Sequence, residues 1–378
     1  ASMYNTGGNT VWISENGGDN WQRNTSIESL ASINQNNGGF FFGTPFAMSP
    51  TNENEALMGS AGNVIQRSND GGRNWTYSSN GFTGARVLQH GRAFDTPSGE
   101  LQALFLVDFG ALITQDNGQS FRTLAVPRFD ARQTTYAGAV QPGSNAQRII
   151  TAAGTYDEQA LIVTTDGGDS WRDTGLTGSF DFIGFDPDDA NIVYAGRFKS
   201  ENAGDSWQTL STAVDNMNLQ DGTLYNYDGN RLRESTDGGE NWASPYPAFN
   251  CSIEGVVDLP NEPESMIAIG PCGVYKLIDN EWQQRGPANG IPNDAFGSQD
   301  TRAVAVSPAN PDFVCIGKWI AYRGQANGVY CSDDGGEQWR AFMFDLAQPF
   351  TPWSLAFAPD GRLHMGSSHG NFILVDAD

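Results

Sequence analysis

Short apolar runs, each bounded by turn-forming residues, recur along the whole chain. Examples are NVIQ before Ser68, ALIVT before Thr165 and NGVYC before Ser332. Short runs flanked by Gly, Asn and Asp are typical of β-strands, and no stretch keeps apolar residues at helical spacing for more than a turn or two. The pattern predicts an all-β chain with many turns.

One polar phrase, STDGGENW from Ser235 to Trp242, separates two of these runs and recurs along the chain. Its near-copies are SENGGDNW at Ser14, SNDGGRNW at Ser68, TQDNGQSF at Thr114, TTDGGDSW at Thr164, SENAGDSW at Ser200 and SDDGGEQW at Ser332. Each copy follows one short apolar run and precedes another that is centred on its closing Trp or Phe. The phrase therefore predicts a hairpin turn.

The residue types in the phrase suit the structure of a tight turn. The leading Ser or Thr, and the Asp two residues later, can accept hydrogen bonds from backbone amides of the turn. The Gly four residues after the hydroxyl suits a positive φ, and the closing ring can bury a large apolar area against a neighbouring sheet. Each conserved position within the repeats thus has a structural explanation.

These copies resemble the Asp-box, or bacterial neuraminidase repeat, whose pattern is S/T-x-D-x-G-x-x-W/F. Asn16 and Asn202 replace the Asp in two copies. The resemblance implies a structural role, outside any catalytic site, for the residues of the five matching copies. They are Ser68, Asp70, Gly72 and Trp75; Thr114, Asp116, Gly118 and Phe121; Thr164, Asp166, Gly168 and Trp171; Ser235, Asp237, Gly239 and Trp242; and Ser332, Asp334, Gly336 and Trp339.

A longer repeat surrounds the phrase and reads as four strands, with the phrase between the third and the fourth. This length suits the blades of a β-propeller. First strands are expected to begin near Phe46, Arg86, Tyr136, Phe182, Asn216, Gly255, Ala303 and Ser354, and one turn is shortened to DNEW at Asp279. We expect residues 1–378 to form a single propeller domain of eight blades, closed by joining the N- and C-terminal strands. Seven blades are the alternative.

The net charge indicates which classes of partner are disfavoured, and the cysteine spacing indicates the cellular compartment. The formal net charge of −23 disfavours nucleic acid and anionic membrane surfaces, and no apolar run reaches membrane-spanning length. Cys251 with Cys272, and Cys315 with Cys331, are close in sequence and suit two disulfides, with buried thiols as the alternative. We expect the protein to be an extracellular or periplasmic monomer that does not insert into a membrane. We expect no metal or cofactor in a functional site; a structural calcium ion at the DPDDAN turn that begins at Asp186 is the alternative.

Propellers commonly bind ligands at the axial end where each new blade begins. Around a closed ring, the connections of the seventh, eighth and first blades would bring several aromatic residues and one arginine together as a stacking surface for sugar rings or a peptide. The alternative is that these rings only anchor long loops. The residues are Trp319, Tyr322, Arg323, Phe350, Trp353, Phe41 and Phe42.

Acidic residues at the same end are candidates for glycoside hydrolysis, which needs two carboxyl groups across the scissile bond. The weak candidates are Asp130, Asp157, Asp181, Asp215, Asp294 and Asp300. The resemblance includes sialidases, xyloglucan-cleaving hydrolases, sortilin-type peptide receptors and photosystem II assembly factors. Two functions remain open: a glycan-active or glycan-binding propeller with a polysaccharide partner, and a non-catalytic propeller that binds a protein or peptide.

Overall fold

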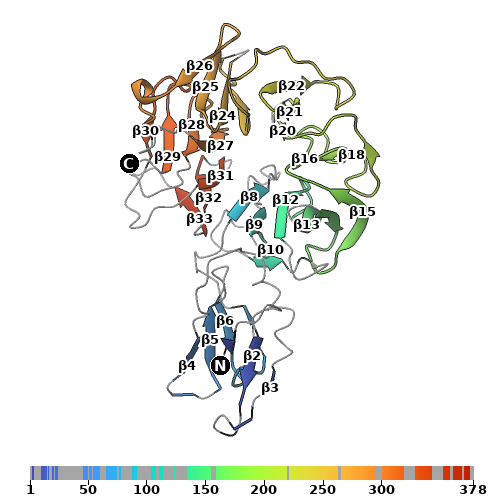
Figure 1. Cartoon of the computed structure of the whole chain (residues 1–378). Coiled ribbons are helices and arrows are strands. Elements are labelled where there is room, and N and C mark those ends of the chain that lie inside the picture. The colour runs from blue at the N-terminus through green and yellow to red at the C-terminus, as the bar shows by residue number, and fades with distance from the viewer. Residues whose placement is uncertain are drawn as a thin grey trace.

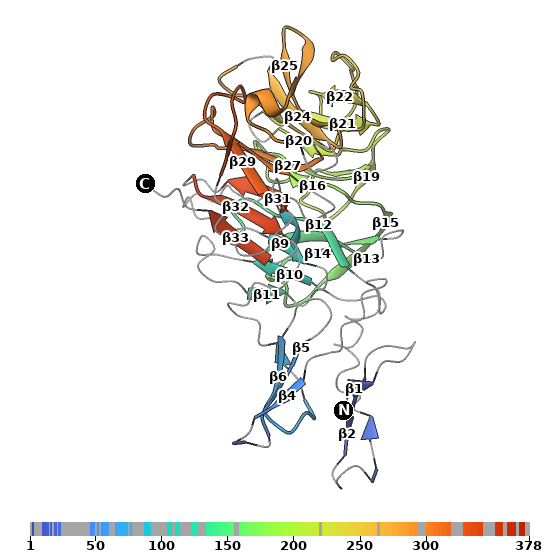
Figure 2. The ribbon, with the colours of Figure 1, turned by 60° about the vertical axis from the view of Figure 1, so that its left-hand side comes forward.

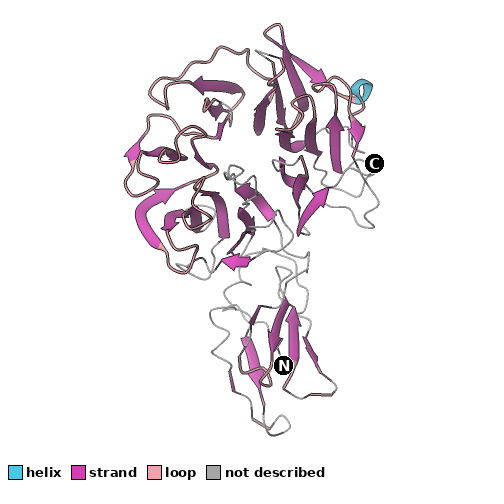
Figure 3. Cartoon of the chain, turned by 180° about the vertical axis from the view of Figure 1, so that it is seen from behind, coloured by secondary structure: helices cyan, strands magenta, loops and turns pink. Residues whose placement is uncertain are grey.

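The computed structural model describes residues 2–3, 10–14, 16, 19–20, 22–23, 46–49, 51–52, 54–59, 65–74, 76–77, 87–91, 104–107, 110–113, 122–124, 126, 134–154, 159–218, 221–262, 265–293, 300–318, 328–342, 352–357, 361–367 and 370–374. Within these ranges the chain is almost entirely β, with one short 3-10 turn at Pro287–Asn289 (Figure 3). The prediction of an all-β protein is confirmed.

Strands that follow one another in sequence pair antiparallel to form separate sheets. Two sheets belong to the N-terminal part: β1 Ser2–Met3, β2 Thr10–Ile13 and β3 Gln22–Arg23; β4 Phe46–Met48, β5 Ala56–Gly59, β6 Ile65–Ser68 and β7 Thr76–Tyr77. Three more follow: β8 Val87–Gly91, β9 Leu104–Val107, β10 Gly110–Ile113 and β11 Arg122–Leu124; β12 Thr134–Val140, β13 Ile149–Gly154, β14 Gln159–Thr164 and β15 Arg172–Gly178; β16 Ile183–Phe185, β17 Val193–Ala195, β18 Phe198–Ser200 and β19 Gln208–Thr209.

The C-terminal half adds four sheets of the same kind. They are β20 Asn216–Met217, β21 Leu224–Asp228 and β22 Arg231–Ser235; β23 Gly255–Asp258, β24 Met266–Gly270, β25 Gly273–Ile278 and β26 Glu281–Arg285; β27 Thr301–Val306, β28 Val314–Lys318, β29 Gly328–Ser332 and β30 Arg340–Ala341; and β31 Pro352–Phe357, β32 Leu363–Ser367 and β33 Gly370–Leu374. Each of the eight predicted first strands begins a sheet within two residues of its expected position.

The sheets from β8 to β33 are arranged around a central axis, and β31 lies beside β8 (Figures 1 and 2). The sheets of β1–β3 and β4–β7 lie apart from this ring in both views. The predicted joining of terminal strands is not observed among the described residues, because β2 pairs with β1 and β3 in one sheet and β33 pairs with β32 in another. The count of eight blades is therefore not confirmed.

The apolar core lies between neighbouring sheets. Ile150 and Val163 of one sheet pack with Ile183 and Val193 of the next, and all four side chains are buried. The closing ring of the repeated phrase contributes to such contacts, since Trp339 is 5 % exposed and packs in a cluster with residues of the preceding sheet. Burial of apolar area between sheets, rather than within one sheet, is what holds the ring together.

Both predicted disulfides are present. Cys315 and Cys331 face each other on β28 and β29, while Cys251 in the connection before β23 is bonded to Cys272 at the turn between β24 and β25. The predicted short turn at Asp279 is also confirmed, because Asp279 and its neighbour Asn280 both have positive φ between the paired residues Ile278 and Glu281.

Basic side chains connect several sheets to the turn of the next sheet. Three arginines from outer strands donate to carbonyl oxygens of that turn: Arg122 to Gly167 (2.7 Å), Arg172 to Gly204 (3.1 Å) and Arg285 to Gly336 (3.2 Å). Lys276 is 2 % exposed and lies between Glu262 and Glu337 at 2.9 Å from each. The repeated turns therefore also make contacts between sheets.

Candidate functional site

Acidic residues occupy matching positions where consecutive first strands begin. Asp215 directly precedes β20, Glu254 directly precedes β23, and Asp300 directly precedes β27. Asn216 donates a hydrogen bond from its side chain to the carbonyl of Val256 at 2.8 Å, which ties β20 to β23, and β23 packs against β27. Because these strands run in the same direction around the ring, their starts lie at one axial end.

One arginine joins two of these carboxylates across neighbouring sheets. Arg302, on β27, contacts Asp300 through Nε to Oδ1 and through Nη2 to Oδ2, each at 2.9 Å. Its Nη1 donates to Oε1 of Glu254, also at 2.9 Å. A guanidinium group that binds both oxygens of one carboxylate has little freedom to rotate, so this arrangement fixes the relative placement of the two acids.

Irregular strand register accompanies this end of the ring. The pairing of β27 with β28 shifts between Thr301 and Ala303, and the pairing of β31 with β32 shifts between Pro352 and Ser354. Bulges of this kind re-aim a side chain and are common beside functional sites. Arg302 and Trp353 are the residues placed at the two shifts, on sheets that pack against each other.

Asp215 lies in a different environment, without an ion pair among the described residues. Its Oδ2 accepts hydrogen bonds from the side chain of Asn226 at 2.9 Å and from the amide of Tyr227 at 2.6 Å. Because Oδ2 is occupied in this way, a proton on the carboxyl group would sit on Oδ1. Burial raises the pKa of Asp215, and the negative charge of Asp181 raises the pKa further.

Glu254 also has a raised pKa, but with opposing causes. Burial raises the pKa of this carboxyl, the Arg302 guanidinium lowers it, and the charge of Asp300 raises it again. The side chains of Glu254 and Asp300 are 25 % and 11 % exposed. Carboxyl groups whose pKa values are shifted by burial and by a specific partner are typical of functional sites, although structural ion pairs produce such shifts too.

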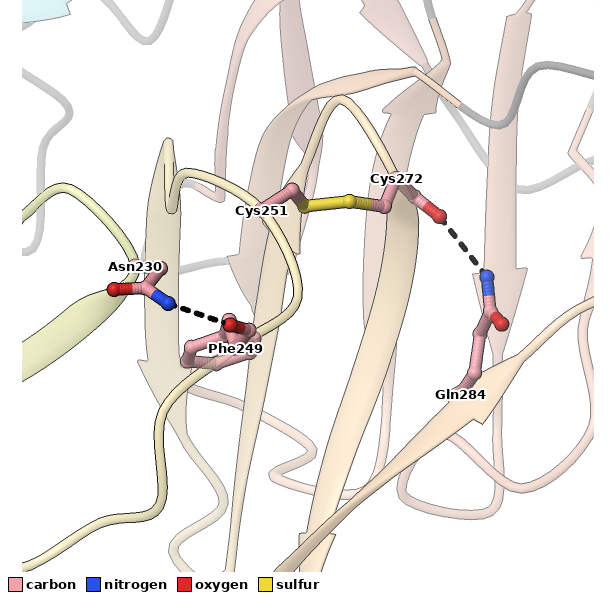
Figure 4. Close-up of a disulfide and its surroundings, with 5 residues drawn as sticks. All are labelled: Asn230, Phe249, Cys251, Cys272 and Gln284. Carbon is pink, nitrogen blue, oxygen red and sulfur yellow. Dashed lines mark hydrogen bonds between the residues drawn. A yellow bond between two sulfur atoms is a disulfide. The ribbon is translucent and has the colours of Figure 1, made fainter.

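The connection that carries Glu254 is anchored on both sides of Cys251 (Figure 4). The Cys251–Cys272 disulfide attaches it to its own sheet, and Gln284 donates to the carbonyl of Cys272 at 2.9 Å. On the other side, Asn230 donates to the carbonyl of Phe249 at 2.8 Å. These contacts hold the connection between two sheets immediately before Glu254.

The repeated turns lie at the end of each sheet opposite to the end where its first strand begins. They have the hydrogen bonds predicted from their residues. In the turn at Ser235, the hydroxyl accepts from the amide of Gly239 at 2.9 Å and donates to Asp237 at 2.8 Å. Asp237 accepts from the amide of Asn241 at 2.9 Å. The same bonds occur at Ser68, Thr164 and Ser332, with positive φ at Gly72, Gly168, Gly239 and Gly336.

The hydrogen bonds of these turns account for their Asp residues. Donation by the amide of Asn74 lowers the pKa of Asp70 to about 2, and donation by the amide of Asn241 lowers that of Asp237 to about 2. For Asp166, the hydroxyl and amide of Ser170 lower the pKa in the same way. A carboxylate that is held ionised and fully engaged in a turn is a poor proton donor.

Several predicted residues lie outside the described residues, so the predictions for them are not tested. They are Asp130, Asp157, Asp294, Trp319, Tyr322, Arg323, Phe350, Phe41 and Phe42, together with Trp75, Thr114, Asp116, Gly118 and Phe121 of the repeated turns. Of the remaining candidates, Asp181 lies close enough to Asp215 for its charge to raise the pKa of Asp215, and Asp300 lies beside Arg302. Trp353 is half-buried on the sheet that follows that of Asp300.

Sequence reasoning missed Glu254 and Arg302. The signal for Glu254 was present, because it directly precedes GVVD just as Asp215 precedes its own first strand. Arg302 had no such signal, since its importance comes from the register shift on β27 and from the neighbouring sheet. A comparison of matching positions across the repeats would have found the first residue but not the second.

The described residues give no indication of a metal centre. Among them, no group of three or more His, Cys, Asp or Glu side chains is arranged to hold an ion. In the turn at Asp186, the Oδ1 atom accepts from the amides of Asp188 at 2.9 Å and Asp189 at 3.2 Å, as in an ordinary polar turn. No helix in the described part of the chain is long and apolar enough to span a membrane.

Comparison with known proteins identifies the fold. No family model matches the chain, and no match is found among curated proteins. A GH74 xyloglucanase from Xanthomonas campestris is similar in structure, with 19% identity and a TM-score of 0.60 over 98% of this chain and 56% of that chain. YCF48 bound to D1 peptide has 16% identity and a TM-score of 0.57, with 78% of this chain and 94% of that chain covered.

A third similar structure is the extracellular domain of a one-component system protein from B. thetaiotaomicron. It has 10% identity and a TM-score of 0.55, with 78% of this chain and 39% of that chain covered. This chain thus spans about half the length of the xyloglucanase and less than half the length of the extracellular domain. At such identities the likeness concerns the fold alone, and this chain shares the fold of the β-propeller proteins.

Proposed function

We propose that the protein binds a polysaccharide at the axial end of its propeller and hydrolyses a glycosidic bond there. The observation that carries the proposal is the set of Asp215, Glu254, Arg302 and Asp300 at the starts of three consecutive first strands. Glycoside hydrolysis uses one carboxyl group that can hold a proton and one carboxylate that is ionised. Burial raises the pKa of both Asp215 and Glu254, but among the described residues only Glu254 has an adjacent cation, Arg302, which favours its ionised form.

The reaction assigns a task to each carboxyl group. The protonated carboxyl of Asp215 gives its proton to the glycosidic oxygen as the bond from that oxygen to the anomeric carbon breaks. The carboxylate of Glu254 takes a proton from water, and the water oxygen bonds to the anomeric carbon. Both oxygens of Asp300 are engaged by Arg302, so Asp300 supports the site and does not act on the substrate.

The proposed substrate class is a neutral glycan. The carboxylates at this end and the net charge of −23 would repel a glycan that carries uronate or sulfate groups. Trp353 is half-buried on the sheet next to that of Asp300, and we propose that its ring contributes to an aromatic surface with Trp319, Tyr322 and Phe350. The xyloglucanase among the similar structures supports a neutral β-glucan as the first substrate to test.

The test is a panel of neutral, uronate-bearing and amino-sugar polysaccharides, scored for binding and for new reducing ends. We expect the wild type to cleave a neutral glycan, and the variant Asp215→Asn to lower kcat by about 10²–10⁴-fold, which is the usual contribution of acid–base catalysis. Asp188→Asn is the matched control, because Asp188 is exposed in the turn between β16 and β17. Failure of every glycan to bind would overturn the proposal.

A second candidate is binding of a basic peptide without catalysis. It is favoured by the row of carboxylates, which would attract cationic groups, and by the likeness to YCF48 bound to D1 peptide, whose chain is covered almost completely. Peptide binding that depends on Glu254 and Asp215, together with no new reducing ends from any glycan, would select this candidate. In either case we propose a monomer that works outside the cytoplasm, as the two disulfides favour.

A further inference from the structure

We propose that Arg302 is a positioning residue, which fixes Glu254 relative to Asp300 and favours its ionised form, so that Asp215 acts as the proton donor. The proposal rests on the proposed function for its catalytic consequence. Its structural part, however, concerns only the charge state and placement of Glu254, which can be measured without a substrate. It therefore assigns different roles to two carboxyl groups that occupy matching positions in consecutive sheets.

The first step is the geometry of the guanidinium group. Nε and Nη2 engage both oxygens of Asp300, which sets the plane of the group, and Nη1 then points at Oε1 of Glu254. Only an arginine can make three such contacts from one rigid fork, because a lysine carries a single ammonium centre. Asp300 is thus the anchor of the arginine, and Glu254 is the group that the arginine orients.

The second step is the position of the arginine. Arg302 lies where the pairing between β27 and β28 shifts, with Thr301 opposite Lys318 and Ala303 opposite Gly317. Thr301 is fully buried and Lys318 is also buried, so the strand cannot easily slide at this point. The shift aims the arginine toward the neighbouring sheet, and Glu254 belongs to that sheet.

The third step is the contrast with Asp215. Within the described ranges, the charges that act on Glu254 are those of Arg302 and Asp300, whereas the charge that acts on Asp215 is that of Asp181. Among the described residues, Asp215 makes no ion pair, and its hydrogen bonds come from the neutral donors Asn226 and Tyr227. A carboxyl group beside a cation stays ionised more readily than one beside another carboxylate.

The test is a titration of the Glu254 and Asp215 carboxyl carbons by NMR in the full chain, with Arg302→Gln, Arg302→Lys and the control Arg233→Gln. Arg233 pairs with Asp228 on an exposed part of the sheet that begins directly after Asp215. We expect Arg302→Gln to raise the titration midpoint of Glu254 by about 1 pH unit or more, which is the usual effect of removing an adjacent opposite charge. The midpoint of Asp215 should not change.

Activity provides the readout of positioning. When a glycan that the protein cleaves is the substrate, the acidic limb of the pH profile of kcat/KM in Arg302→Gln should move to higher pH, together with the titration midpoint of Glu254. Arg302→Lys should recover less than half of the kcat/KM that Arg302→Gln loses, because lysine lacks the guanidinium fork. An unchanged Glu254 midpoint in a folded Arg302→Gln protein would overturn the proposal. If Arg302→Gln does not fold, the proposal would be overturned equally by an Arg302→Lys variant whose Glu254 midpoint and activity match those of the wild type.

Failure of the proposed function is a separate outcome. A wild-type protein that neither binds nor cleaves any glycan would remove the catalytic role, but the NMR midpoints would still show whether Arg302 controls the ionisation of Glu254. Conversely, a protein that cleaves a glycan with Arg302→Gln as efficiently as the wild type would retain the function and reject the role of the arginine.

Discussion

The acidic residues of the repeated turns and those that precede the first strands lie in opposite environments. In the repeated turns, Asp70 is half-buried and Asp237 is exposed, and backbone amides donate to them and lower their pKa values. At the axial end, Asp215 and Glu254 are partly buried, and burial raises their pKa values. Acidic residues therefore stabilise the repeated turns, whereas those before the first strands have raised pKa values that suit the proposed proton transfer. Burial and the supply of backbone donors decide which role a carboxyl group has.

The largest expected effect tests this division directly with one variant from each end. Glu254→Gln should lower the rate of glycan cleavage by about 10²–10⁴-fold, with little change in the thermal midpoint, because the proposed role of this carboxylate is to act on the substrate. Asp237→Asn should lower the thermal midpoint and leave the rate unchanged, because its hydrogen bonds only hold a turn. Paired kinetics and calorimetry measure both. Equal losses of rate in the two variants would contradict the division.

Asp258 lies at the turn end of β23. It therefore tests whether burial, rather than location at the axial end of the sheet, raises the pKa of a carboxyl group. Burial raises its pKa to about 6 despite a hydrogen bond from the Tyr225 hydroxyl. The folded pKa exceeds the unfolded value, so the free energy of unfolding should fall as the pH rises from about 4 to 6, by at most ~3 kcal/mol at 1.36 kcal/mol per pH unit.

The measurement is the free energy of unfolding in urea between pH 4 and 7. Asp258→Asn should remove this part of the pH dependence and be more stable than the wild type at pH 7, since it does not ionise. A variant with the same pH profile as the wild type would show that Asp258 does not carry the effect.

A smaller effect is expected from the hydroxyl that closes a turn. Ser235 is 2 % exposed, and its hydroxyl accepts from the amide of Gly239. Ser235→Ala leaves a buried amide without that acceptor and should destabilise the protein by about 1–3 kcal/mol, with unchanged glycan affinity. Ser211→Ala, at an exposed position after β19, is the control. The free energy of unfolding of both variants is measured by urea denaturation. Equal values would show that the Ser235 hydroxyl does not stabilise the turn.

The smallest effect is expected from the turn carboxylates below pH 4. Their folded pKa values lie below the ordinary value of 3.8, so the stability that they contribute is present above pH 4 and is lost as the pH falls toward 2. Thermal midpoints measured from pH 4 to pH 2 should fall, and less steeply in Asp237→Asn than in the wild type. A steeper fall of the thermal midpoint in Asp237→Asn than in the wild type would contradict a stabilising role for the ionised Asp237 carboxylate.

The fold was more accessible from the sequence than the site. The hairpin turns, the first strands and the disulfides are local features, written in short segments such as STDGGENW and in the spacing of Cys315 and Cys331. Ring closure was predicted from the terminal strands, yet β2 and β33 lie in different sheets. The pairing of Arg302 with Glu254 depends on a register shift and on packing between sheets, which no local pattern encodes.

The basic contacts between sheets have a practical consequence for chemical modification. The chain contains three lysines, Lys199, Lys276 and Lys318, and their side chains are largely withdrawn from solvent. Lys276 lies between two glutamates, and Lys318 donates to the carbonyl of Pro292. Amine-reactive dyes, cross-linkers and resins should therefore react slowly with the folded protein at its lysines. Carboxyl activation would label it efficiently, but at the cost of the acidic groups on which the proposed site depends.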